Sequence, residues 1–238
     1  MKRASMAIII GAMIVAAVGV GWAFGARQSG QGAATVPIQP AATPATAGGQ
    51  DQMFAARVRG SEDAPMTMYE VADFQCPACR VFFVETLPTI EREYVRTGKL
   101  RIVFVNFPLV SIHPNAAAAH EFAMCAAQQN RFWPIHDLLY ANQDRWASLG
   151  DPAPYFRILA DSAALVSDAL STCLDSGEMR APLMHEAQGA YNAGVRSTPS
   201  FVVEGGLVQG AAPIESWRPL LDSIFLAKTA TTGRPPGG

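Results

Sequence analysis

Two cysteines, Cys76 and Cys79, constrain the chain most, because they stand where a predicted strand meets a predicted helix. Residues 66–73 favour a strand, and residues 77–97 favour a helix that Gly98 ends. A helix N-terminus offers unpaired N–H groups and about half a positive charge. It therefore stabilises a thiolate, the species that attacks disulfides. Cys79, one turn further on, is close enough to resolve a mixed disulfide.

The two residues between the cysteines refine this expectation. Pro77 suits the first helical position, where a missing N–H costs nothing. Ala78 brings neither a charge nor a hydrogen bond of its own. We therefore expect the pKa of Cys76 to be lowered, but less than it would be with a histidine at position 78.

Other uses of this cysteine pair fit less well. A c-type haem site needs a histidine after the second cysteine, and position 80 is Arg80. A four-cysteine zinc site needs two paired knuckles, whereas Cys125 and Cys173 are isolated, so no metal site is expected. A purely structural disulfide between Cys76 and Cys79 stays open, since an exported protein permits it.

The remaining pattern predicts an α/β fold. Residues 100–107 form a second, nearly continuous apolar strand, which completes a strand–helix–strand unit with residues 66–97. Residues 109–193 are mainly helical. Strand signals return at residues 195–204, followed by a Gly205-Gly206 hairpin turn and a final helix from Pro213. Without the helical block, the order is that of a thioredoxin-like core with an inserted all-helical domain.

The N-terminus is expected to direct export. Lys2 and Arg3 precede 23 residues, 4–26, that carry no charge. As a helix they would reach roughly 34 Å, enough to cross a bilayer core. Residues 1–26 are therefore a signal-anchor or a cleaved signal peptide, and either one exports the remainder of the chain. Residues 27–52 read as a flexible linker, residues 53–228 as the folded domain and residues 229–238 as a disordered tail.

Composition excludes other classes of protein. Half of the 238 residues are hydrophobic, 16% are charged, and the formal net charge is -2. The chain is thus not disordered as a whole. An excess of basic residues, which is typical of nucleic-acid-binding proteins, is absent from the sequence, so no nucleic-acid partner is expected.

Residues 60–227 resemble the DsbA-like thiol oxidoreductases, which are thioredoxin-fold proteins with an inserted helical domain. The segments that carry the resemblance lie on both sides of the helical block. They are Gly60–Pro65, Asp73–Cys79, Asn106–Pro108, His113–Asn115, Gly194–Phe201 and Gly205-Gly206.

The resemblance implies roles for individual residues. It makes Cys76 the nucleophile, Cys79 the resolving cysteine, Glu70 a buried acid and Thr198-Pro199 the cis-proline loop that pairs with extended substrates. From the sequence alone, Pro199 could equally begin a strand with a trans bond. Apart from the redox-active disulfide, no cofactor is implied.

Glu70 has two possible environments. It alternates with Met66, Met68 and Ala72 on one strand face, which looks apolar. Burial there would raise its pKa and let it carry the proton of Cys79. The alternative is a glutamate in solvent at a strand end.

Cys125 and Cys173 lie on two predicted helices of the insertion. Some subfamilies of the DsbA-like group carry a comparable pair, so a structural disulfide is expected in an oxidising compartment. Two buried free thiols or a second redox pair remain alternatives. Of the histidines, His113 is expected to shape a helix start, while His120, His136 and His185 are expected to serve in packing or at the surface.

The resemblance also implies a function: disulfide transfer to unfolded or folding exported polypeptides in the periplasm or another extracytoplasmic space. A membrane quinone-linked partner would reoxidise the protein, which is expected to be monomeric and tethered to the inner or cytoplasmic membrane. The alternative is a disulfide reductase or isomerase. Residues 27–50 are too short and too simple in composition for the dimerisation domain of an isomerase, which favours the oxidant. A non-catalytic chaperone or binding module is disfavoured by the intact cysteine pair.

Overall fold

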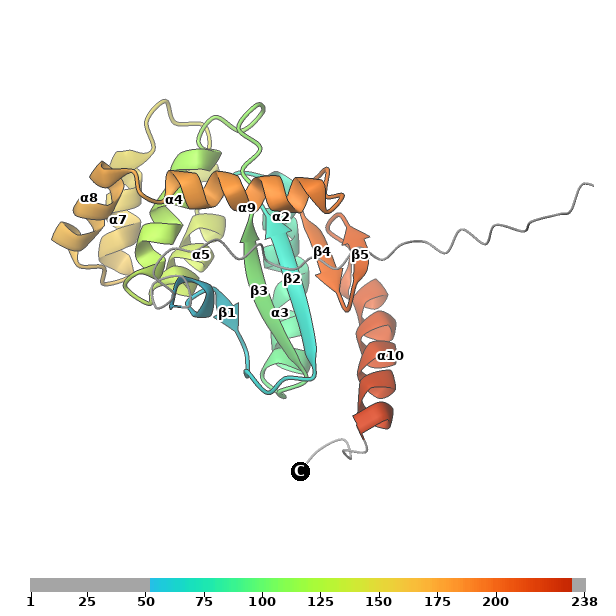
Figure 1. Cartoon of the computed structure of the whole chain (residues 1–238). Coiled ribbons are helices and arrows are strands. Elements are labelled where there is room, and N and C mark those ends of the chain that lie inside the picture. Colours follow the sequence, from blue (N-terminus) through green and yellow to red (C-terminus); the bar gives the residue numbers. More distant parts are fainter. Residues whose placement is uncertain (1–51, 233–238) are drawn as a thin grey trace, which may run out of the picture. The chain divides into compact units, whose positions relative to one another are not determined.

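The structure, a computed structural model, describes residues 52–232 (Figure 1). The predicted anchor or signal at residues 1–26 lies outside the described residues, as do most of the predicted linker and the end of the tail. Within residues 52–232, no helix is both long enough and apolar enough to cross a membrane.

A five-stranded mixed sheet in the order β1-β3-β2-β4-β5 forms the centre of the fold. The central strands β2 and β3 run parallel, as the strand–helix–strand pattern predicts, and the other pairs are antiparallel. Glu70 in β2 lies opposite Phe104 of β3 and Phe201 of β4. The strands are β1 (Val58–Arg59), β2 (Met66–Ala72), β3 (Leu100–Asn106), β4 (Ser200–Val203) and β5 (Gly206–Gln209).

The helical segment that comes after β2 runs from residue 77 to residue 95. It contains α2 (Pro77–Val81), the π-helical turn η1 (Phe82–Thr86), α3 (Leu87–Ile90) and a second π-helical turn, η2 (Glu91–Val95). Pro88, where a kink was expected, falls in the first turn of α3, so its missing N–H does not interrupt the middle of a regular helix. The positive φ of Gly98, 70°, comes just after the end of this segment.

The helical block between β3 and β4 builds a second core, which lies beside the sheet in Figure 1. Phe122, Phe132, Tyr140 and Trp146 are fully or almost fully buried in it. The sequence did not indicate the short α6. The helices are α4 (Ala116–Ala127), α5 (Phe132–Ala141), α6 (Gln143–Trp146), α7 (Ala153–Ser162), α8 (Ser167–Ser176) and α9 (Arg180–Asn192).

The two faces of the sheet have different covers. The segment 77–95 and α10 (Ile214–Thr232) pack on one face, around Met68, Phe201 and Trp217. On the other face, α9 packs against Val71 and crosses the sheet in Figure 1. The thioredoxin-like α/β fold with additional helices is therefore confirmed.

The C-terminal part differs from expectation at three points. The strand predicted from Val195 begins only at Ser200, because the preceding residues form the loop that enters the cis Thr198-Pro199 bond. Helix α10 continues to Thr232, although a tail was expected from residue 229, because no glycine or proline occurs between that residue and Gly233. The hairpin turn, expected at Gly205-Gly206, is made by Glu204 and Gly205, both with positive φ, and Gly206 already begins β5.

Candidate functional site

Cys76 is the N-cap residue of α2. Its backbone is extended (φ -70°, ψ 122°), and Pro77 comes next at the start of the helix. The N–H of Cys76 donates to the carbonyl of Asp73 at 3.1 Å, and its own carbonyl accepts from the N–H of Arg80 at 3.2 Å. The first helical turn thus directs its unpaired N–H groups at the Cys76 sulfur.

The two cysteines are free thiols with opposite ionisation behaviour. Hydrogen bonding with Cys79, with the Thr198 side chain and with the N–H groups of Cys79 and Ala78 lowers the pKa of Cys76 to about 6, against the opposing effect of burial. Cys79 is completely buried, and burial together with the neighbouring Cys76 raises its pKa well above the ordinary value. At neutral pH the pair therefore holds one thiolate, on Cys76, and one thiol, on Cys79.

The Thr198-Pro199 peptide bond is cis, and its loop lies against Cys76. The Cys76 thiol donates to the Thr198 carbonyl at 3.5 Å. The Pro199 carbonyl is already engaged by the N–H of Gly210 at 2.8 Å. Tertiary structure thus brings together the two segments in which the sequence placed the cysteines and the substrate loop.

Glu70 is buried in the sheet, with only 1% of its surface exposed. Burial raises its pKa to about 8, while Arg59 opposes this rise. Its β4 neighbour Phe201 packs at 4.4 Å against Phe82, which lies one turn beyond Cys79. The carboxyl therefore occupies the sheet face that α2 and η1 cover, and it carries a proton at neutral pH.

Asp73 is a member of the site that the sequence reasoning missed. Its carboxylate, completely buried, accepts from the N–H groups of Gln75 at 2.7 Å and Leu109 at 2.8 Å, and its Oδ2 lies 2.7 Å from Nδ1 of His113. Although burial acts to raise it, the pKa of Asp73 is lowered by hydrogen bonding with His120, His113 and the Leu109 N–H. An ionised carboxylate thus holds the loop that leads into Cys76.

Gln143 of the helical block is a second missed residue. Its side-chain amide donates to the carbonyls of Phe74 at 2.7 Å and Cys76 at 3.0 Å. Gln75 similarly donates to the Ala147 carbonyl at 2.7 Å. Two polar residues just before Cys76, Asp73 and Gln75, could have indicated a polar site at the end of the strand. Their partners are distant in the sequence and could not be predicted from it.

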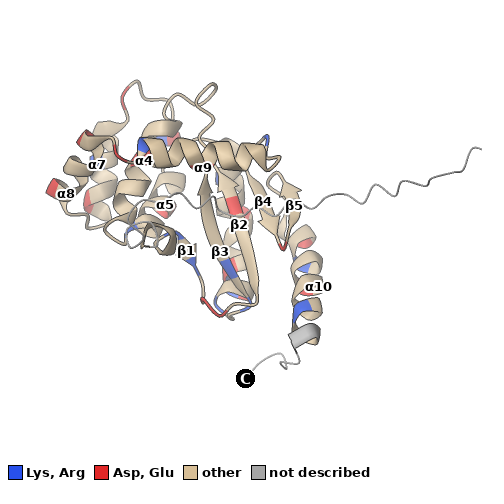
Figure 2. Ribbon diagram, in the orientation of Figure 1, with Lys and Arg blue, Asp and Glu red and all other residues tan. Residues whose placement is uncertain are grey.

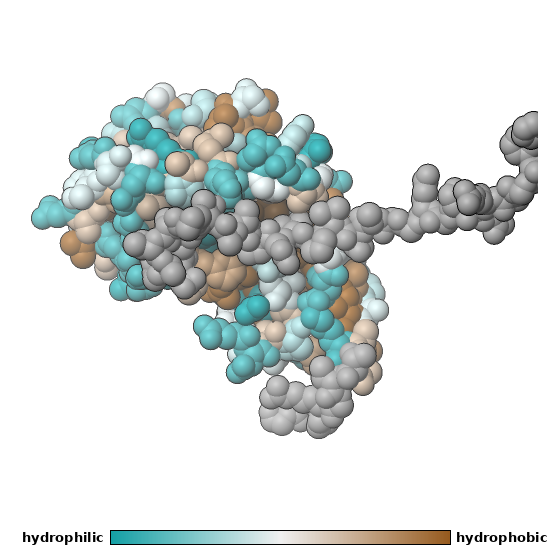
Figure 3. Space-filling view, viewed as in Figure 1, coloured by the Kyte–Doolittle hydropathy of each residue, from teal (hydrophilic) through white to brown (hydrophobic). Residues whose placement is uncertain are grey.

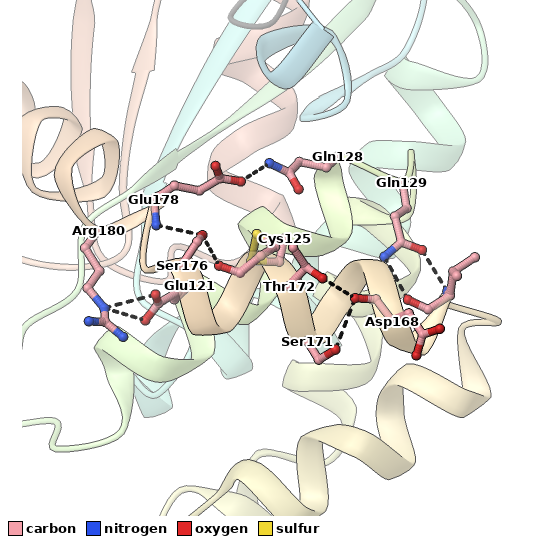
Figure 4. Close-up of a disulfide and its surroundings, with 12 residues drawn as sticks. Glu121, Cys125, Gln128, Gln129, Asp168, Ser171, Thr172, Ser176, Glu178 and Arg180 are labelled. Atoms are coloured by element: carbon pink, nitrogen blue, oxygen red, sulfur yellow. Dashed lines mark hydrogen bonds and ion pairs between the residues drawn. A yellow bond between two sulfur atoms is a disulfide. The ribbon is translucent and has the colours of Figure 1, made fainter.

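A disulfide joins Cys125 of α4 to Cys173 of α8, with an S–S distance of 2.03 Å and 48 residues of separation. Figure 4 shows polar contacts around it that connect α4 to the end of α8 and to α9. Glu121 pairs with Arg180 at 3.0 Å, and Gln128 donates to Glu178 at 2.6 Å. The disulfide lies in the helical block and crosslinks its own helices.

The distribution of charged, metal-binding and hydrophobic side chains describes the surroundings of the site. Acidic and basic side chains are interspersed over the described part of the chain in Figure 2. Among residues 52–232, no group of three or more His, Cys, Asp or Glu side chains is arranged to hold a metal ion. At the top of Figure 3, hydrophobic residues gather where the loop after β3 lies, and in this loop Val110 and Ile112 are 52% and 68% exposed.

Sequence comparison places the chain among known proteins. Residues 54–223 match the family model described as Thioredoxin. The probable disulfide bond formation protein D of Bacillus anthracis is 28% identical over 165 residues, which cover 66% of this chain and 75% of that protein. The Na(+)/H(+) antiporter NhaA 3 of Salinispora tropica is 33% identical over 181 residues, which are 76% of this chain but only 26% of the antiporter.

Solved structures share the fold. Wolbachia pipientis α-DsbA1 superposes with a TM-score of 0.66 at 22% identity, covering 74% of this chain and 94% of that one. Oxidised BdbD of Bacillus subtilis superposes with a TM-score of 0.65 at 21% identity, covering 71% and 92%. The family match extends over the strands, the cysteine pair and the helical block, and these structural neighbours are DsbA-like. The chain therefore belongs to the thioredoxin family, and it shares its fold with DsbA-like proteins.

Proposed function

We propose that the protein donates disulfides to exported polypeptides through the Cys76–Cys79 pair. The observation that carries this proposal is the contrast between the two thiols: Cys76 has a pKa of about 6, and Cys79 has a pKa well above its ordinary value. A stabilised Cys76 thiolate favours the reduced protein over its disulfide. Such a protein passes its disulfide on readily.

Transfer takes two exchange steps. A substrate thiolate attacks the Cys76 sulfur of the oxidised pair, so that a mixed disulfide forms and Cys79 leaves as a thiolate. Glu70 gives Cys79 its proton. A second substrate thiolate then attacks the substrate sulfur of the mixed disulfide and releases Cys76 as its stabilised thiolate. The substrate is thereby oxidised by two electrons and the Cys76–Cys79 pair is reduced.

Substrate contacts would be made beside Cys76. An extended peptide can pair with the backbone of the Thr198-Pro199 loop without regard to its side chains, which suits a protein that serves many substrates. The exposed Val110 and Ile112 come just after Leu109, through which Asp73 anchors their loop, and they offer apolar surface for unfolded chains.

The cellular setting is part of the same proposal. Residues 1–26 would export the domain and tether it to the membrane, and residues 27–52 would serve as the linker. A quinone-linked membrane partner would reoxidise the pair, and the protein would act as a monomer without a cofactor. The names of the Bacillus relatives, disulfide bond formation protein D, support the direction of the reaction.

Equilibration with glutathione tests the proposal. We expect a reduction potential between about -120 and -180 mV, the range of disulfide donors and isomerases, and a value near about -270 mV would instead favour a reductase. Cys76→Ser is expected to abolish exchange, with Cys125→Ser plus Cys173→Ser as the matched control that leaves the exchanging pair in place. Unchanged exchange in Cys76→Ser would contradict the proposal.

A further inference from the structure

Glu70 and His136 are two of the buried residues with side-chain polar atoms that lack hydrogen-bond partners among the described residues. Glu70 is 1% exposed and His136 is completely buried. Within residues 52–232, neither carboxyl oxygen of Glu70 has a hydrogen-bond partner, and neither does Nε2 of His136. Buried polar atoms without partners are costly and uncommon, so two in one region call for a physical reason.

The two residues share neighbours. Glu70 lies opposite Phe104 in the parallel β2–β3 pair, so both side chains leave the same face of the sheet. The ring of His136 lies 5.4 Å from that of Phe104 and 5.0 Å from that of Tyr140. The charges of Cys79 and Glu70, together with burial, raise the pKa of Tyr140, so all of these groups border one interior region.

The other face of His136 meets a carboxylate that opens to solvent. Its Nδ1 lies 2.8 Å from Oδ1 of Asp137, whose side chain is 45% exposed. Despite partial burial, hydrogen bonds from His136 and Arg59 lower the pKa of Asp137, which is therefore ionised. An ionised Asp137 accepts only, so Nδ1 of His136 carries the proton and Nε2 presents a lone pair.

The O–H of Glu70 and the Nε2 lone pair of His136 are a complementary donor and acceptor. Because Glu70 is protonated at neutral pH, its O–H needs an acceptor, and the Nε2 lone pair is an unused acceptor in the same region. We propose that His136 and Asp137 form the route by which the buried carboxyl of Glu70 exchanges its proton with solvent, with a bridging water between Glu70 and Nε2 of His136. His136 is thus a positioning residue that acts through Glu70, and the inference rests on the proposed function.

The route matters when the reduced protein is reoxidised. Cys76 forms a mixed disulfide with the oxidant, and Cys79 must then lose its proton to attack the Cys76 sulfur. Glu70 cannot accept that proton while it holds its own. His136 takes the Glu70 proton at Nε2 and passes its Nδ1 proton to Asp137 and on to solvent; the emptied carboxylate then accepts the proton of Cys79. The Cys76–Cys79 bond forms as the mixed disulfide breaks, and the oxidant carries away two electrons as its leaving thiolate.

Other charged groups face this region. Arg59 of β1 and Glu91 of η2 act on both Glu70 and His136. Arg59 forms ion pairs with Glu91 and Asp137 and stacks over Trp133 at 4.1 Å. Burial lowers the pKa of His136, so the uncharged imidazole prevails at neutral pH. Glu70 is therefore the group whose charge changes near pH 8.

The test measures resolution of a mixed disulfide. The reduced full chain is mixed with oxidised glutathione, and release of the Cys76-bound glutathione by Cys79 is timed across neutral pH. We expect the wild-type rate to rise with an inflection near the Glu70 pKa of about 8. His136→Phe should slow the neutral-pH rate about 10-fold, below the full effect of a general base, because Glu70 remains.

A double-mutant cycle separates the route from packing. In a Glu70→Gln background, His136→Phe should cause no further loss of rate. His185→Phe, the same replacement at an exposed position of α9, is the control, and its pH inflection should persist. If His136→Phe does not fold, His136→Gln, which cannot take up a proton, replaces it throughout.

A second readout does not need activity. The infrared carbonyl band of protonated Glu70, identified by its loss in Glu70→Gln, should shift in His136→Phe, because the proposed water-bridged contact with Nε2 is lost. The inference would be overturned if the His136 variants kept both the pH dependence of the wild-type rate and the position of the Glu70 carbonyl band. It would also be overturned if His136→Phe slowed resolution of the mixed disulfide equally in the wild-type and Glu70→Gln backgrounds. Failure of the wild-type protein to exchange with glutathione would instead contradict the proposed function, and the infrared result would still decide the Glu70–His136 contact.

Discussion

The sulfur of Cys76 lies 3.5 Å from the carbonyl oxygen of Thr198, which is 122 positions further along the chain. The contact joins the N-terminus of α2 to the cis-proline loop, so the sulfur proposed to form the mixed disulfide lies beside the backbone proposed to hold substrates. Apart from its interaction with Cys76, the buried Thr198 hydroxyl has no hydrogen-bond partner among the described residues. It is therefore available to the ionised sulfur.

Thr198→Val is expected to raise the pKa of Cys76 from about 6 towards its ordinary value, because the Thr198 side chain lowers it. The lowered pKa stabilises the reduced folded state fully above the ordinary pKa of 9.0, and this stabilisation decreases as the pH falls and is lost below about 6. The variant should lose part of it. Thiolate absorbance during a pH titration measures the shift. Thr97→Val, at an exposed site where Thr97 bonds only local carbonyls, is the control. An unshifted Thr198→Val titration would assign the low pKa to Cys79 and the N–H groups of the first helical turn.

Glu70→Gln is expected to stabilise the protein at neutral pH. The folded-state pKa of about 8 lies above the ordinary 4.5, so the unfolded chain releases this proton first and stability falls as pH rises between these values. The gain at pH 7 should be about 3 kcal/mol at most. Urea unfolding of the oxidised protein on either side of this window measures it. A gain that does not grow with pH would contradict a raised Glu70 pKa.

Replacing both Cys125 and Cys173 by alanine is expected to destabilise the helical block. The bond closes a long loop, with a sequence separation of 48 residues, and loop entropy sets the loss at up to about 4 kcal/mol. Denaturant unfolding measures the loss, and an unchanged Cys76 titration is the control for the site. When the Cys76–Cys79 pair is in its thiol form and no reductant is added, alkylation should label only Cys76 and Cys79. Labelling of Cys125 and Cys173 would contradict the disulfide between them.

Gln143→Leu is expected to cost about 1–3 kcal/mol of unfolding free energy, because it leaves the carbonyls of Phe74 and Cys76 without this buried donor. Thermal or denaturant unfolding measures the loss. Gln188→Leu, at an exposed position of α9 where Gln188 bonds Asn192, is the matched control and should be nearly neutral. Equal losses in the two variants would show that Gln143 does not support the entry to α2.

Local patterns explain which features could be predicted. The β2–α2 junction results from strand propensity, a proline suited to a first turn and the length of the helix, all of which lie within about 30 residues. The hairpin was likewise predicted from its glycines, although the turn lies at Glu204-Gly205, one residue before the expected Gly205-Gly206. The start of β4 at Ser200 was missed, because the path of residues 195–199 depends on the loop around the cis bond rather than on their own strand propensity.

A thioredoxin-like core, a helical insertion and a cysteine pair at a helix N-terminus could all be read from the sequence, because spacing and propensity act over a few residues. Only the tertiary structure decides which side chains surround Cys76 and Glu70. Asp73, Gln143 and His136 look like ordinary polar residues in the sequence, and their significance comes from burial and from partners many residues away. Burial changes the cost of each charge, and burial is a property of the folded chain rather than of any segment.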